Sequence, residues 1–298
     1  MPESWAASEL DERLVRRRFD RAARIGTAAD PLSREVARRM HERLDYLRID
    51  PGRVLDLGCG TGPDFAALHE RFPRAQIVGV DFSLASLTQL ASPAGSWFHR
   101  WMATPRRRVG RVCASARRLP LPDGSIGLAW SNLMLNWLGD PLPALKEIHR
   151  VMDTGGALLF SCFGPDTLRE LRTALTTTSG ERVHRFPDMH DVGDALIGAG
   201  FSDPVMDMEL LTVTYPDLDT LLSDLKGGGC TNASRTRPRG LSGRSAWTSA
   251  RRQIESQMRD GRLPVSFEVV QGHAWKEAPR QNSDGGAIVR FHPRQARD

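Results

Sequence analysis

The sequence contains little cysteine. Its 298 residues include four cysteines, Cys59, Cys113, Cys162 and Cys230, and no two of them form a C-x-x-C pair. The spacing therefore predicts neither a zinc site nor a disulfide framework, and a reducing cytoplasm is the setting that we expect. The histidines, His184 among them, show no metal-ligand spacing either, so no metal is expected.

Long apolar runs are also missing. No stretch approaches the roughly 20 apolar residues that a membrane span needs. The segment 1–12 carries four acidic side chains and no apolar core, which argues against a secretory signal and against a transit peptide. We therefore expect a cytoplasmic protein without a membrane partner.

Lysine is almost absent, because only Lys146, Lys226 and Lys276 accompany the arginines among the 41 basic residues. The net charge of +5 therefore rests on arginine. Proteins that bind single-stranded nucleic acids combine basic residues with interleaved aromatic residues, on which the bases stack. The arginine clusters of this sequence lack such aromatics. We expect no nucleic-acid partner.

A glycine-rich turn is the most informative feature that is present. Residues 54–62 read VLDLGCGTG, a short apolar strand followed by three glycines at alternate positions. A helix over 64–72 and a second strand over 76–80 should follow, and the second strand ends at Asp81. An acid about 20 positions after such glycines commonly binds a ribose, so the pattern predicts a nucleoside-type ligand.

The spacing of the glycines indicates which ligand is bound. A dinucleotide-binding turn has the spacing G-x-G-x-x-G, which seats a pyrophosphate on the following helix. Here the spacing is G-x-G-x-G, with Asp56 two residues before it. That carboxylate would repel a pyrophosphate but would suit a cationic ligand. The pattern resembles motif I of the class I methyltransferases, which bind S-adenosylmethionine.

Strands and helices alternate along the chain, which predicts an α/β fold with a doubly wound, Rossmann-like sheet. Strands are expected at 54–57, 77–80, 111–114, 126–131, 156–163, 204–214 and 264–275, and a helix at 189–199. We expect N-terminal cap helices over 1–50, a methyltransferase domain over 51–276 with a lid insertion at about 216–263, a surface insertion over 92–111, and a flexible tail over 277–298.

Three longer motifs are more specific than the glycine turn. WSNLMLNW, GPDTLRELR and DMHDVGDAL, together with RRRFDRAA near the start, resemble the BioC family, the malonyl-acyl carrier protein O-methyltransferases of biotin synthesis. The resemblance extends to about Lys276. It implies a seven-stranded sheet with the last strand antiparallel, a helical cap, S-adenosylmethionine as cofactor, and an acyl carrier protein carrying a malonyl thioester as partner.

The resemblance also implies a set of cofactor-binding residues. Asp56 and the three glycines would line the methionine end, Asp81 would hold the ribose, Phe82 would flank the adenine, and Asn132 would lie near the methyl group. The full expected set is Asp56, Gly58, Cys59, Gly60, Gly62, Asp81, Phe82, Ser115, Ala116 and Asn132.

Two positions depart from the family pattern. Ser115 stands where an acid usually accepts a hydrogen bond from the adenine amine, and a hydroxyl accepts such a bond more weakly. Gly26 and Thr27 stand where a Tyr-Asp pair usually follows FDRAA. These departures leave two alternatives open, a protein arginine hydroxylase like the respiratory complex I assembly factors, and a non-catalytic module that binds the cofactor and a partner.

Methyl transfer to a carboxylate needs alignment rather than a general base, so no catalytic nucleophile is expected. Selection of the carboxylate needs a cation, and Arg150, Arg169 and Arg172 are the candidates. Trp137 could wall the substrate. Each also has a structural interpretation, which is helix-end packing for Arg150, a solvated helix face for the other two arginines, and core packing for Trp137.

The expected partner is acidic, and the sequence offers two arginine-rich segments that could meet it. The resemblance places both segments around the substrate entrance. The arginines are Arg16, Arg17, Arg18, Arg34, Arg38 and Arg39 in the N-terminal helices, and Arg235, Arg237, Arg239 and Arg244 in the lid. Complementary charge of this kind raises the rate of encounter and is screened by salt.

Overall fold

The structure is a computed structural model that describes residues 10–26, 30–89, 110–175, 181–240 and 243–278. The predicted tail begins at residue 277, and from residue 279 it lies outside the described residues. The predicted surface insertion lies outside them up to residue 109.

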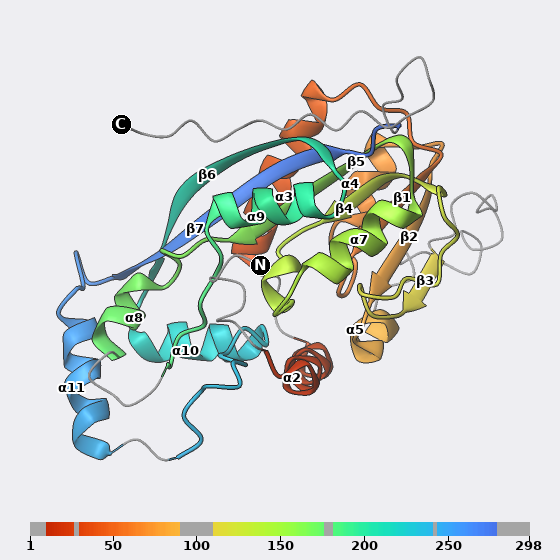
Figure 1. Ribbon diagram of the computed structural model, residues 1–298. Coiled ribbons are helices and arrows are strands. Elements are labelled where there is room, and N and C mark those ends of the chain that lie inside the picture. Colours follow the sequence, from red (N-terminus) through yellow and green to blue (C-terminus); the bar gives the residue numbers. More distant parts are fainter. Residues whose placement is uncertain (1–9, 27–29, 90–109, 176–180, 241–242, 279–298) are drawn as a thin grey trace.

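A seven-stranded sheet forms the centre of the molecule (Figure 1). Its order is β3-β2-β1-β4-β5-β7-β6, and β7 is antiparallel to both of its neighbours, whereas β1 to β5 pair in parallel. The strands are β1 Arg53–Leu57, β2 Gln76–Asp81, β3 Gly110–Cys113, β4 Ile126–Ser131, β5 Met152–Phe163, β6 Ser202–Tyr215 and β7 Leu263–Trp275. The predicted doubly wound, seven-stranded sheet is therefore confirmed.

The predicted strands are confirmed to within a few residues, with the largest difference at β5. This strand begins at Met152, four residues before the predicted start at residue 156. Its pairing with β4 shifts register between Ile126 and Leu128, and Gly155 has a φ of 82°. The polar, glycine-rich start of β5 therefore has the sequence of a turn but the pairing of a strand.

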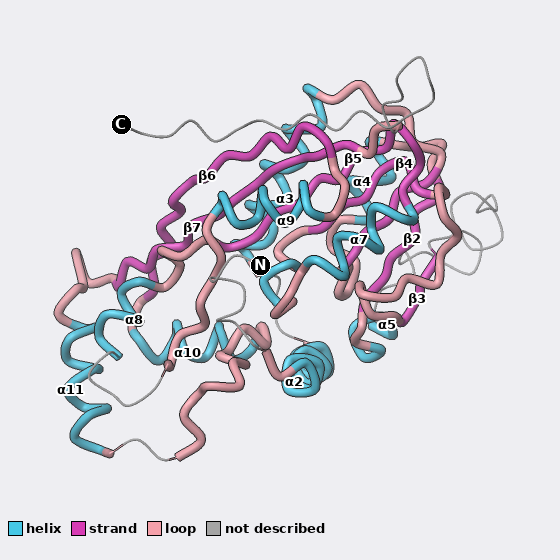
Figure 2. The backbone as a smooth tube through the Cα atoms, viewed as in Figure 1, coloured by secondary structure: helices cyan, strands magenta, loops and turns pink. Residues whose placement is uncertain are grey.

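Helices cover both faces of the sheet (Figure 2). One face packs on α3 Pro31–Arg43, α4 Phe65–Arg71 and α5 Leu84–Gln89, and the other packs on α7 Leu142–Val151 and α9 Met189–Gly198. The central strands are buried on both sides, so β1 and β4 read as nearly continuous apolar runs.

The predicted lid insertion, called the lid below, contains the helices α10 Leu218–Gly227 and α11 Arg244–Glu255. α11 packs on α8 Arg169–Leu175, the helix that follows β5, and α10 packs on the N-terminal helix α2 Glu12–Ile25. Since α8 and α5 follow β5 and β2 directly, these helices gather at the carboxyl ends of the parallel strands. Figure 1 shows α2 between α5 and α10 at this end of the molecule.

The two predicted N-terminal helices have different surroundings. α3 buries Val36 and Met40 in the main core, whereas α2 buries Val15 against Leu10 and the lid residue Ala233. α2 ends at Gly26, whose φ of 66° is the left-handed conformation that favours glycine at a helix terminus. This backbone conformation explains why a glycine is favoured at position 26, one of the positions that depart from the family pattern.

Candidate active site

The glycine turn lies where the carboxyl ends of β1 and β2 meet. Gly58, Gly60 and Gly62 have φ angles of 77°, 53° and 76°, which glycine adopts without the steric cost of a Cβ atom. The Gly58 N–H donates to the carbonyl oxygen of Val80 at 2.8 Å. A Cβ atom on Gly58 would lie 2.4 Å from Cγ of Met134, whereas one on Gly60 would meet nothing within 4 Å. The turn is therefore packed on one side and open on the other.

Asp81 fastens the turn to the second strand. Its Oδ2 accepts the Gly60 N–H at 2.9 Å, and its Oδ1 accepts the Ser83 N–H at 2.7 Å. The side chain is buried, and this burial raises the pKa of its carboxyl. The structure thus places Asp81 directly beside the predicted cofactor turn.

Two further buried carboxyls lie near the turn. Asp56 is 2% exposed, and its Oδ2 has no hydrogen-bond partner within the described residues. Burial raises the pKa of Asp56 well above its ordinary value, and the charges of Asp64 and Asp81 raise it further. Asp64 accepts a hydrogen bond from Nε1 of Trp130 at 2.9 Å. The three carboxyls create a negative environment that favours a cation.

Asn132 connects three elements just after β4. Its Nδ2 donates to the carbonyl oxygen of Ser33 in α3 at 3.0 Å, and its Oδ1 accepts the Ser161 hydroxyl of β5 at 2.9 Å. The next residue, Leu133, has a φ of 53° and is held by a bond from its N–H to Ser161 Oγ at 2.9 Å. A strained non-glycine residue at a strand end is common at functional sites.

A chain of aromatic rings, which we call the aromatic wall, runs from the cofactor turn toward the lid. The ring centroid of Phe19, from α2, lies 5.9 Å from Phe82 and 5.1 Å from Trp137. Trp137 lies 5.8 Å from His184, which stacks on Phe186 at 5.0 Å. The wall therefore joins Phe82, predicted for the adenine, to Trp137, predicted for the substrate.

Phe19, His184 and Phe186 are the members of the aromatic wall to which the sequence assigned no role. Phe19 is the only aromatic residue of an arginine-rich helix, and this isolation is the signal that could have indicated it. Burial lowers the pKa of His184 to about 4, and the positive charge of Arg172 adds to the effect. His184 is therefore neutral at pH 7 and acts as a ring surface.

Three of the predicted cofactor residues have different degrees of exposure. Ser115 is exposed just after β3, and its Oγ accepts the Arg117 N–H at 3.3 Å. Ala116 is partly buried against the core. Cys59 is 3% exposed, and burial raises the pKa of its thiol, so it carries no thiolate and cannot serve as a nucleophile.

Arg172 is the predicted substrate arginine that lies closest to the aromatic wall. Its guanidinium donates to the carbonyl oxygens of Pro165, of Thr167 at 3.1 Å and of His184 at 3.2 Å. Its Nε–H has no partner in the part of the chain that the structure describes. Burial lowers the pKa of this guanidinium. A half-buried cation without a paired carboxylate can receive an anion.

The other two predicted arginines have different surroundings. Arg169 is 50% exposed, and its guanidinium lies 3.6 Å from Asp166 and 3.5 Å from Glu170. Arg150 donates to Glu147 and Asp123, and also to the backbone carbonyls that precede β4. These bonds use its donors at the amino end of the strands, which favours the packing interpretation of Arg150.

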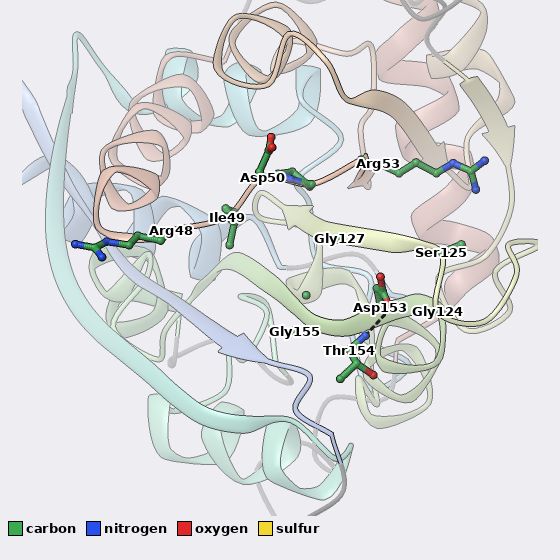
Figure 3. A pocket seen from close by; sticks show the side chains of 13 residues that line it. Arg48, Ile49, Asp50, Arg53, Gly124, Ser125, Gly127, Asp153, Thr154 and Gly155 are labelled. Atoms are coloured by element: carbon green, nitrogen blue, oxygen red, sulfur yellow. Dashed lines mark hydrogen bonds between the residues drawn. The ribbon is translucent and has the colours of Figure 1, made fainter.

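A cavity of about 490 Å³ lies at that same amino end of the strands, opposite the glycine turn (Figure 3). It is lined by the backbone before β1 and by the starts of β4 and β5. Figure 3 shows the side chains of Arg48 and Arg53 at this cavity pointing away from one another. Among the described residues, no cluster of three His, Cys, Asp or Glu side chains could hold a metal ion. None of the helices in the described ranges has the length and apolarity of a bilayer span.

The residues at the glycine turn fit S-adenosylmethionine. Gly60 leaves open space for a backbone to approach a ligand, and the unpartnered oxygen of Asp56 needs a donor or a cation. Asp81 ends the second strand, where a ribose is held in related sheets. A cofactor with an ammonium, a sulfonium and a ribose matches this set of groups.

Comparison with known proteins defines the class. Residues 55–160 match the family model of a methyltransferase domain. The crystal structure of the YcgJ protein from Bacillus subtilis superposes with a TM-score of 0.55 at 16% identity, over 82% of this chain and 99% of that one. The protein is therefore a class I methyltransferase that uses S-adenosylmethionine.

Curated relatives define the family. A protein of Gallionella capsiferriformans is 45% identical over 283 residues, covering 94% of this chain and 96% of its own. One of a Methylovorus species is 45% identical over 287 residues, covering 96% of both chains. Both are named malonyl-acyl-carrier protein O-methyltransferase. The chain belongs to the malonyl-acyl-carrier protein O-methyltransferase family.

Proposed function

We propose that this enzyme methylates the free carboxyl of a malonyl thioester on an acyl carrier protein, an early step of biotin synthesis. The observation that carries the proposal is the 45% identity to relatives of that name, which extends over the whole of their length except a few per cent. Because the matched region covers 94% and 96% of this chain, it supports the same substrate as well as the same cofactor.

In this proposal the chain's own residues hold the cofactor, which supplies a methyl group on its sulfonium when bound. Asp56 and the glycine turn bind the methionine end, and Asp56 gains a partner for its free oxygen. Asp81 accepts a ribose hydroxyl, since an ionised carboxylate has about four acceptor positions and two backbone N–H groups occupy only part of them. Phe82 covers the adenine, and Ser115 accepts its amine.

The substrate residues then have to orient a carboxylate that is already ionised, so no general base is required. Arg172 is assigned to the malonyl carboxylate because its guanidinium faces only carbonyl oxygens among the described residues. Trp137 and the rest of the aromatic wall exclude water from the reacting atoms. Asn132, held by two elements, marks the end of β4 near the transferred methyl group.

The test is a methylation assay with a matched pair of substrates. The purified protein is incubated with S-adenosylmethionine and either malonyl or acetyl acyl carrier protein, and the carrier is analysed by intact mass. We expect a single methylation on the malonyl carrier and none on the acetyl carrier, which has no free carboxyl. Methylation of both carriers, or of neither, would reject the assignment.

A further inference from the structure

The outer face of α2 carries four exposed arginines that form no ion pair with a carboxylate among the described residues. Arg13, Arg17, Arg21 and Arg24 are all exposed and follow one another at intervals of three or four residues, so they form one stripe. None of the four makes an ion pair or a side-chain hydrogen bond within the described residues. We call these four residues the α2 stripe.

Some arginines on other helices are neutralised by carboxylates. On α3, Arg38 pairs with Glu35 at 2.8 Å and also with Glu42. On α11, Arg251 pairs with Asp219 at 2.6 Å. α3 and α11 carry four and three arginines, against six on α2, and carboxylates pair with several of them. Among these helices, α2 therefore has the most arginines without a paired carboxylate in the described residues.

The acidic residues of α2 and of its N-terminal cap make hydrogen bonds or ion pairs with groups outside the α2 stripe. Asp11 caps the helix by accepting the Leu14 N–H at 3.0 Å, and Glu12 pairs with Arg117 at 3.1 Å. Asp20 accepts the hydroxyl of Ser83 at 2.6 Å. Each carboxylate is thus bound to the body of the protein, and positive charge dominates the outer surface.

The same helix forms part of the site. Its inner side places Phe19 against Phe82 and Trp137, the first two members of the aromatic wall. A backbone bond from the Asp11 N–H to the Ala233 carbonyl at 2.9 Å fixes the start of α2 to the lid. A molecule bound to the stripe would therefore lie beside the site and could reach it with a flexible arm.

We propose that the α2 stripe is the docking surface for the acidic carrier protein that brings the acyl group. This inference rests on the proposed function for the identity of the partner. Arginines on a rigid helix suit carboxylates because their guanidinium groups bind them bidentately. Such a stripe steers an acidic partner toward the site and raises the association rate, by roughly 10-fold or more at low salt.

The test compares two charge-reversed pairs. Arg17→Glu with Arg21→Glu reverses the charge at the centre of the α2 stripe. The matched control is Arg48→Glu with Arg53→Glu, two exposed arginines at the amino end of the parallel strands, opposite the site. Both pairs change the net charge equally. A gentler pair, Arg13→Gln with Arg24→Gln, adds no carboxylate and guards against a folding defect, which circular dichroism would also detect.

Two measurements are made on each variant, kcat/KM and the affinity for labelled carrier protein by fluorescence anisotropy. We expect the Arg17/Arg21 pair to lower kcat/KM for malonyl carrier protein roughly 10-fold or more at low salt. The Arg13/Arg24 pair should lower it less, and the control pair should have little effect. Activity on malonyl-N-acetylcysteamine, which has no carrier, should stay unchanged in all variants.

The outcomes separate this inference from the proposed function. Equal losses in the α2 pair and the control pair, or no loss in either, would overturn the docking surface. If the wild type methylated no malonyl substrate, the proposed function would fail, but anisotropy would still test docking. A wild-type affinity for carrier protein that did not fall with added salt would also overturn the docking surface, because salt screens the charge of an exposed arginine stripe.

Discussion

The glycine turn permits a test in which two neighbouring substitutions should have different effects, one mainly on stability and the other mainly on cofactor binding. Gly58→Ala and Gly60→Ala both place a Cβ atom at a positive φ, which costs roughly 1 kcal/mol each. They differ in their surroundings. The new Cβ at residue 58 would lie 2.4 Å and 2.6 Å from Cγ and Cβ of Met134, whereas the new Cβ at residue 60 would lie in open space.

The two variants should therefore separate folding from binding. Overpacking against Met134 adds about 1 to 3 kcal/mol, so Gly58→Ala should lower the free energy of unfolding by about 2 to 4 kcal/mol without ligand. Gly60→Ala should lower it by only about 1 kcal/mol. Its Cβ would occupy the space that the cofactor needs, so its affinity should fall at least tenfold, which corresponds to about 1.4 kcal/mol.

The assays are urea denaturation without ligand and calorimetric titration with S-adenosylhomocysteine. Wild-type affinity in Gly60→Ala would refute the idea that the open side of the turn receives the cofactor. A Gly58→Ala protein as stable as Gly60→Ala would refute the close packing of the turn on Met134. Either result could occur without the other, so the two parts of the reasoning are tested independently.

Four further predictions concern the same site. S-adenosylhomocysteine at 100 times its dissociation constant should raise the free energy of unfolding by about 2.7 kcal/mol, as measured by urea denaturation. Asp81→Ala should weaken the binding of S-adenosylhomocysteine by about 1 to 3 kcal/mol. If calorimetry gave an unchanged affinity, Asp81 would be only a strand-end cap. Arg172→Gln should raise KM for the malonyl substrate while leaving S-adenosylhomocysteine affinity intact, and steady-state kinetics showing a normal KM would exclude it as the carboxylate partner. The pKa of His184 falls to about 4 on folding from an ordinary value of 6.5, so the unfolded chain binds more protons between those values. Stability should therefore drop as pH falls through this window, by on the order of 3 kcal/mol. Urea titrations of His184→Gln should show a flatter pH dependence, and an unchanged slope would contradict the burial argument.

The sequence alone determined the fold and the cofactor turn, because both are encoded over short distances. Apolar runs that end in glycine or an acid specify buried parallel strands, and the G-x-G-x-G spacing with Asp56 and Asp81 specifies the class of ligand. The family motifs specified the antiparallel last strand, which pairing of β7 with β5 confirms.

The tertiary structure decided which side chains meet and which charges remain free. The sequence contains no sign that Phe19 contacts both Phe82 and Trp137, because these residues are far apart in the chain and meet only when α2 packs beside α5. The sequence left Arg150 with two interpretations, substrate binding and helix-end packing, and the folded chain favours packing because it brings the backbone carbonyls before β4 to the guanidinium.

The same limit applies to the arginine-rich helices. In the sequence, α2 and α3 are both rich in arginine, and the pairing of Arg39 with Glu209 of β6 depends on a contact across 170 positions. An arginine forms an internal ion pair or remains available to a partner according to its distance from carboxylates on other elements. Only the folded chain fixes that distance.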